Sequence, residues 1–211
     1  MKSLILHYEQ AIKRFQMLDG IPPLLLRLYL APVFMQAGWT KFQNFDNTVA
    51  WFGNSEWGLG LPLPELMVTL AAGTELIGGA FLVIGLCTRL FAIPLAITMA
   101  VAALTAHWSN GWLAIADPSS WFANGTLMLN ESVMAAADKK AMAIEILKEH
   151  GNYEWLTSSG SFTILNNGIE FAATYFIMAI VLLFSGGGRF TSIDYYLKKE
   201  LLNRSSMRVN L

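Results

Sequence analysis

The chain has a single cysteine, Cys87, among 211 residues. One cysteine excludes an intramolecular disulfide and a Cys-x-x-Cys redox motif within this chain. Phosphate-binding glycine loops, His-Glu-x-x-His patterns and Met-x-x-Met tracts are also missing from the sequence. We therefore expect no metal site and no hydrolase or kinase chemistry of the soluble type.

Charge is scarce as well, because charged residues make up 14% of the chain, against about 25% in soluble domains. The net charge of −1 gives a nucleic-acid-binding role no electrostatic support. Hydrophobic residues account for 55% of the chain, and the mean hydropathy is +0.46. The deficit of charge falls in four apolar stretches, which is the pattern of membrane spans.

A membrane span needs roughly 20 mostly apolar residues, and the stretches 22–41, 65–86, 89–108 and 167–186 meet this requirement. The sequence therefore predicts an all-α protein, a four-transmembrane-helix bundle with surface amphipathic helices, embedded in a lipid bilayer. We place this membrane domain at residues 21–195.

Three segments flank or interrupt the predicted bundle. Residues 1–20 carry apolar side chains at helical spacing and predict an N-terminal interfacial amphipathic helix. Residues 109–166 form a long extracytoplasmic insert, and residues 196–211 form a basic cytoplasmic tail. Within the insert, an apolar stripe over 133–147 predicts an amphipathic helix. This helix can cap the bundle, lie on the bilayer, or dock a protein partner.

Basic residues collect on one side of the predicted spans, which places both termini in the cytoplasm. The residues on that side are Lys2, Lys13, Arg14, Arg89, Arg189, Lys198, Lys199, Arg204 and Arg208.

Glu75 lies halfway along the apolar stretch 65–86. A carboxylate at that depth is costly unless it is paired or faces a cavity. At a rise of about 1.5 Å per residue, Arg27 lies roughly 8 Å and Glu75 roughly 16 Å from the cytoplasmic ends of their spans. We expect an Arg27–Glu75 ion pair or a water-bridged equivalent, with either a structural or a functional role.

A second polar cluster is expected at the extracytoplasmic mouth of the bundle. Lys41, His107 and Glu170 fall at the same level of three predicted spans, and Asn166 and Asn167 are close by. These groups can bind an anionic head group, contact a quinone carbonyl or relay protons. The alternatives are an interfacial role for His107 and a lysine that extends to the lipid head groups.

Three ordered motifs resemble the DoxX family: Leu26–Lys41 with Arg27 and Gly38, Glu75–Gly79 running on to Gly85–Arg89, and Gly186–Asp194. The resemblance covers residues 22–108 and 167–195.

The resemblance implies a four-helix bundle of the bacterial inner membrane. The founding members of that family are subunits of a thiosulfate:quinone oxidoreductase, and others are membrane partners in redox or detoxification complexes. Some accompany iron-dependent enzymes that modify copper-binding peptides. The long insert at 109–166 and the lack of a cysteine pair depart from the thiosulfate-oxidising members.

Two functions follow as hypotheses. The first is an accessory subunit of a quinone- or redox-linked complex, with no cofactor in the chain other than a bound quinone. Arg27, Lys41, Glu75, His107 and Glu170 would line its polar interior. The second is a non-catalytic scaffold or exporter partner for a peptide-modifying or copper-stress system, which docks its partner through residues 109–166.

Overall fold

The computed structural model describes the backbone of residues 2–209. It describes the side chains in that range except those of residues 2–4, 6, 11 and 204–209. Over these residues the protein is all-helical, with two isolated β-bridges and no strand. The predicted fold class is confirmed to that extent.

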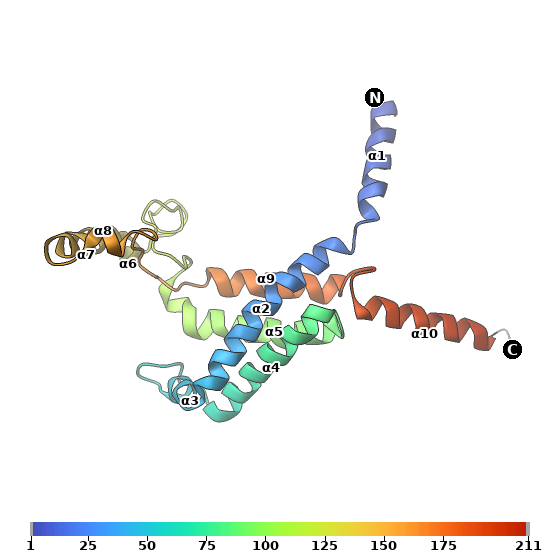
Figure 1. Ribbon diagram of the computed structural model, residues 1–211, viewed down its shortest axis with the longest axis horizontal. Helices are drawn as coiled ribbons and strands as arrows, with labels where there is room; N and C mark the ends of the chain where they lie inside the picture. The colour runs from blue at the N-terminus through green and yellow to red at the C-terminus, as the bar shows by residue number, and fades with distance from the viewer. Residues whose placement is uncertain (1, 210–211) are drawn as a thin grey trace. The chain divides into compact units, whose positions relative to one another are not determined.

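The chain divides into two compact units, Met1–Met99 with Tyr175–Leu211, and Ala100–Thr174. Figure 1 shows the helices of both units. The helices of the first unit are α1 (Lys2–Gln16), α2 (Ile21–Gln43), α3 (Phe45–Gly53), α4 (Pro64–Ile84), most of α5 (Thr88–Ala102), most of α9 (Glu170–Ser185), and α10 (Ile193–Val209).

Local sequence signals set the ends of the long helices in the first unit. Pro22 and Pro23 occupy the first turn of α2, and Pro64 begins α4. Proline suits these positions because the N–H it lacks has no partner in a first turn. Gly85 ends α4 with a φ of 67°, a left-handed conformation that glycine adopts without a steric penalty. The chain therefore reverses within a few residues and continues into α5.

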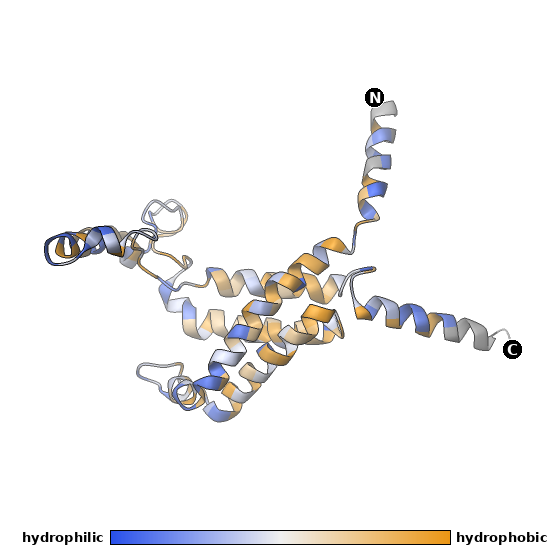
Figure 2. Ribbon diagram, in the orientation of Figure 1, coloured by the Kyte–Doolittle hydropathy of each residue, from blue (hydrophilic) through white to orange (hydrophobic). Residues whose placement is uncertain are grey.

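The core of the first unit consists of side chains from α2, α4, α5 and α9, and Leu30, Leu82, Leu95 and Leu182 are fully buried in it. Many large apolar side chains of the same helices are exposed instead, among them Leu70, Ile97 and Ile177. Figure 2 shows that α4, α5 and α9 are predominantly hydrophobic. Exposed apolar surface on such helices is what a lipid environment requires.

The second unit contains the end of α5 and then η1 (Ala103–His107), a single π-helical turn, and η2 (Trp108–Asn110), a 3₁₀ turn. The amphipathic helix predicted at 133–147 is confirmed, but it is broken at Ala135 into two helices. These two helices are α6 (Glu131–Met134) and α7 (Ala136–His150). The second unit also contains α8 (Tyr153–Leu156), the start of α9, and an isolated antiparallel bridge between Ile115 and Leu165.

Among residues that the structure describes, two helical segments are long and apolar enough to cross a membrane, Pro64–Ile84 and Thr88–Asn110. A third candidate joins His7–Gln16 to Ile21–Gln43 through a bend of 43°. Helix α9 is apolar but has only 16 residues. The structure thus provides two or three candidate spans, and the count of four stays a prediction.

Candidate functional site

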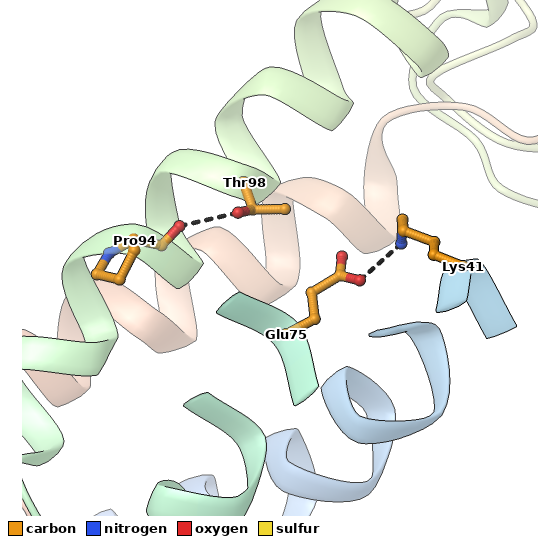
Figure 3. A network of polar contacts seen from close by, with 4 residues as sticks. All are labelled: Lys41, Glu75, Pro94 and Thr98. Atoms are coloured by element: carbon orange, nitrogen blue, oxygen red, sulfur yellow. Dashed lines mark hydrogen bonds and ion pairs between the residues drawn. The ribbon is translucent and has the colours of Figure 1, made fainter. Parts of the chain in front are cut away.

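A buried ion pair joins two long helices of the first unit. The Nζ atom of Lys41, in the last turn of α2, lies 2.7 Å from Oε2 of Glu75 in the middle of α4. The Glu75 side chain is 2% exposed, whereas that of Lys41 is 25% exposed. Figure 3 shows the two side chains pointing toward each other, together with Thr98 of α5, whose hydroxyl group donates to the Pro94 carbonyl oxygen. The lysine is therefore the accessible half of the pair.

Close packing of α2 against α4 brings the two charges together. A Cβ atom added at Gly38 would lie 2.7 Å from the Leu76 backbone nitrogen and 3.1 Å from the Glu75 Cβ atom. A Cβ atom at Gly79 would lie 3.0 Å from the Ala31 carbonyl oxygen. Small residues in these positions let membrane helices approach at backbone distance. Gly38 of α2 and Gly79 of α4 thus mark the two points of close approach that set the register of these helices.

Arg27 does not pair with Glu75, so the predicted direct Arg27–Glu75 ion pair is wrong. The Arg27 guanidinium is fully buried and donates to the carbonyl oxygens of Leu82 at 2.9 Å, Val83 at 3.2 Å and Thr191 at 2.7 Å. The first two are among the last carbonyls of α4, where a helix carries partial negative charge. Backbone carbonyls therefore bind both terminal nitrogens of this guanidinium group.

The register of the helices explains the change of partner. Gly38 lies level with Glu75. Lys41 is three residues further along α2, a rise of about 4.5 Å, whereas Arg27 is eleven residues back, a rise of about 16 Å. An extended lysine bridges the smaller distance. Placing the cytoplasmic ends of the two spans at the same level shifts α2 against α4 by about 8 Å, roughly one and a half turns.

The segment after α9 connects the ends of several helices. The Asp194 carboxylate accepts hydrogen bonds from the backbone N–H groups of Cys87 at 2.7 Å and Thr88 at 2.9 Å, and so caps α5. The Thr191 hydroxyl group donates to the Gly20 carbonyl oxygen. The motif Gly186–Asp194 contained the signal, since it ends with small polar residues, but its partners are far away in the chain.

In the second unit, His107 and Glu170 are each bound to the backbone. The Nδ1 atom of His107 lies 2.9 Å from the carbonyl oxygen of Asn167, and the Asn110 amide donates to the same oxygen at 3.1 Å. The Glu170 carboxylate accepts a hydrogen bond from the Ala114 N–H at 2.9 Å. Because Lys41 belongs to the other unit, its predicted clustering with His107 and Glu170 stays a prediction.

A groove of about 410 Å³ runs along one side of α7 in the second unit. Its walls are mostly apolar, with one charged residue of each sign. It is lined by Ala116, Asp117, Pro118, Ala136, Ala137, Lys140, Ala141, Ile144, Thr163 and Ile164. Ala137, Ala141 and Ile144 belong to the apolar stripe predicted from the sequence. Among the described residues, no group of three or more His, Cys, Asp or Glu side chains is placed to hold a metal ion.

The Lys41–Glu75 pair is the arrangement best suited to ligand binding. An ammonium group has three N–H donors, and the hydrogen bond to Glu75 uses one of them. The remaining donors belong to a side chain that is one quarter exposed, while a buried carboxylate holds the nitrogen in place. Such a group can donate hydrogen bonds to a carbonyl or anionic oxygen.

Comparison with known proteins points to one family. The model of the family described as DoxX matches residues 23–108. A protein of Bacillus subtilis (strain 168) named "Putative oxidoreductase CatD" is 35% identical over 85 residues, which cover 40% of this chain and 59% of that protein. The chain therefore matches less than two thirds of the length of this relative. No solved structure is significantly similar to the chain.

Proposed function

We propose that this membrane protein, whose residues 23–108 match the model of the DoxX family, is a subunit of a quinone- or redox-linked complex. The observation that carries the proposal is the buried Lys41–Glu75 pair, which offers its ammonium group to the polar head group of a small apolar molecule. The name of the Bacillus subtilis relative, "Putative oxidoreductase CatD", supports a redox setting.

A quinone suits this pair because it combines an apolar ring with carbonyl oxygens that accept hydrogen bonds. The Lys41 ammonium group supplies donors, and the Glu75 carboxylate balances its charge. A hydrogen bond from a charged donor contributes about 1.5–3 kcal/mol. Glu75 also has a second oxygen, Oε1, which can exchange a proton with the lysine or with a ligand. The pair thus supports head-group binding or proton relay.

The membrane arrangement that we propose has four spans, formed by α2, α4, the helix that begins with α5, and α9. Both termini lie in the cytoplasm of a bacterium, and the bundle spans its inner membrane. Support comes from two sets of hydrogen bonds, Arg27 to Thr191 and Asp194 to the start of α5. They bring the beginnings of α2 and α5 and the segment after α9 together at one end of the first unit. Arg89 and Arg189 lie at the same end. Lys41 then lies near the extracytoplasmic surface.

Electrons would come from a protein partner. The chain has one cysteine, and the described residues include no cluster suited to a metal ion. We therefore propose that this subunit binds the quinone, positions it and balances its charge, while a partner carries the redox centre.

Titration of the full chain in detergent micelles with decyl-benzoquinone tests the proposal. We expect wild type to bind the quinone and Lys41→Met to bind it roughly tenfold or more weakly, since a charged donor is lost. Lys139→Met, which removes an exposed lysine of α7, is the matched control and should bind like wild type. Absence of binding by wild type, or unchanged binding by Lys41→Met, would overturn the proposal.

A second function, that of a membrane scaffold, is favoured by the apolar groove along α7. In this case the groove docks a protein partner, and Ala141→Arg should abolish co-purification of that partner. Ala143 lies on the same helix but does not line the groove, so Ala143→Arg is the control. Equal co-purification with both variants would contradict docking in the groove.

A further inference from the structure

His107 ends η1, the π-helical turn between α5 and η2, and its side chain is partly exposed. π-Helical turns are rare and occur frequently at functional sites. The carbonyl group that faces His107 belongs to Asn167, a non-glycine residue with a φ of 58°. Two unusual backbone conformations of the second unit therefore meet at one imidazole ring.

The contact with Asn167 determines which ring nitrogen carries hydrogen. A carbonyl oxygen only accepts hydrogen bonds, so the Nδ1 atom 2.9 Å away must be the donor. The Asn110 amide donates to the same oxygen, which therefore has a donor for each of its two lone pairs. In the neutral imidazole, hydrogen on Nδ1 leaves Nε2 as the acceptor.

Nε2 is available for a ligand. Among the contacts between described residues, no hydrogen bond to this atom is present, and the ring is partly exposed. A metal ion is not favoured, since the described residues provide no group of three metal-ligating side chains. A single neutral nitrogen acceptor suits a ligand group that donates one hydrogen bond, such as a hydroxyl group.

We propose that His107 accepts a hydrogen bond at Nε2 from a ligand hydroxyl, so that this position binds the dihydroxy form of a quinone, a quinol, in preference to the dione. The inference rests on the proposed function for the ligand class. The dione has no hydrogen to donate to Nε2. To donate to a dione, His107 would need hydrogen on Nε2, which in the neutral ring would set the Nδ1 lone pair against the Asn167 oxygen.

The position of the hydrogen can be measured directly. The chain has three histidines, and ¹⁵N-histidine labelling of the full chain resolves protonated from unprotonated ring nitrogens by NMR. The His107→Asn variant identifies the signals of His107. We expect a protonated Nδ1 and an unprotonated Nε2 at a pH where the spectrum shows a neutral ring. The opposite tautomer would overturn the inference whatever ligand the protein binds.

Ligand preference is measured by titration with decyl-benzoquinol and decyl-benzoquinone. The matched variant is His107→Asn, because its side-chain N–H group can keep the contact with Asn167 while the acceptor is lost. We expect its quinol affinity to fall about fivefold, the ratio that corresponds to one net hydrogen bond, with little change for the dione. His150→Asn, at the exposed end of α7, is the control and should behave like wild type.

The outcomes separate this inference from the proposed function. If Lys41→Met weakens quinone binding but His107→Asn leaves quinol binding unchanged, the proposed function stands and the role of His107 is wrong. If wild type binds neither form, both are wrong.

Discussion

Lys41 and Glu75 form an ion pair of 2.7 Å although one lies in the last turn of its helix and the other in the middle. The backbone contact at Gly38 brings the two helices close enough for a lysine side chain to reach the carboxylate. The pair keeps a buried carboxylate charge-balanced while leaving the ammonium group accessible.

Removing one partner of this pair should cost more than removing both. Lys41→Met leaves an uncompensated carboxylate, and we expect a loss of about 3 kcal/mol, at the lower end for buried pairs because Lys41 is partly exposed. The double variant Lys41→Met/Glu75→Leu should recover most of that loss. Unfolding of the purified variants in detergent measures both values. A double variant as unstable as the sum of the single variants would contradict the pairing.

Arg27 and Glu75 should act independently. Since Arg27 binds carbonyl oxygens of Leu82, Val83 and Thr191, the effects of Arg27→Gln and Glu75→Gln on unfolding free energy should add to within about 0.5 kcal/mol. The parallel cycle with Lys41→Gln and Glu75→Gln should show a coupling energy above that range. Strong coupling in the first cycle would restore the ion pair predicted from the sequence.

Two glycines of the membrane helices should respond differently to alanine. A Cβ atom at Gly38 would lie 2.7 Å from the Leu76 nitrogen and 2.8 Å from the Ala72 carbonyl oxygen, so Gly38→Ala forces the helices apart. We expect a cost of about 1–3 kcal/mol, as for overpacking elsewhere. A Cβ atom at Gly73 meets nothing within 4 Å, and Gly73→Ala should be neutral or stabilise the helix by up to about 1 kcal/mol. Thermal unfolding of the two variants in the same detergent measures the difference.

Capping of α5 by Asp194 should contribute measurably to stability. Asp194→Ala removes the acceptor for the N–H groups of Cys87 and Thr88, at an expected cost of about 1–2 kcal/mol. Asp194→Asn keeps one acceptor oxygen and should lose less. Chemical unfolding gives the two free energies, and equal losses would show that one retained acceptor oxygen does not stabilise the start of α5.

The exposed loop of the second unit provides a pH-dependent test. Hydrogen bonds from the Ser119 hydroxyl group, at 2.6 Å, and from its N–H hold the pKa of the Asp117 carboxyl below its ordinary value. A lowered pKa in the folded state means that the stabilisation is present above the ordinary pKa and is lost as the pH falls through the lowered one. Ser119→Ala should raise the pKa, which carboxyl ¹³C NMR measures.

The matched control for that titration is Ser120→Ala, because the Ser120 hydroxyl group accepts from Phe122 and does not contact the Asp117 carboxylate. An unchanged Asp117 pKa in Ser119→Ala would show that the hydroxyl group does not hold the charge.

Local patterns were sufficient for part of this protein. The apolar runs predicted α2, α4 and the helix beginning with α5, and the motifs predicted the family, which is confirmed for residues 23–108. Apolar spacing predicted a helix at 133–147, but the break at Ala135 depends on how the second unit packs around Val133 and Ala136, which are both buried.

The sequence by itself determined that Glu75 needs a partner, because a carboxylate cannot remain alone in an apolar helix. Only the tertiary structure decided that the partner is Lys41. Position along one helix follows from residue number, but the level of a neighbouring helix depends on the packing of Gly38 and Gly79, and a shift of about 8 Å, roughly one and a half turns, exchanges one cation for another. The carbonyls that solvate Arg27 come from residues as far away as Thr191, a separation in the chain that no local pattern spans.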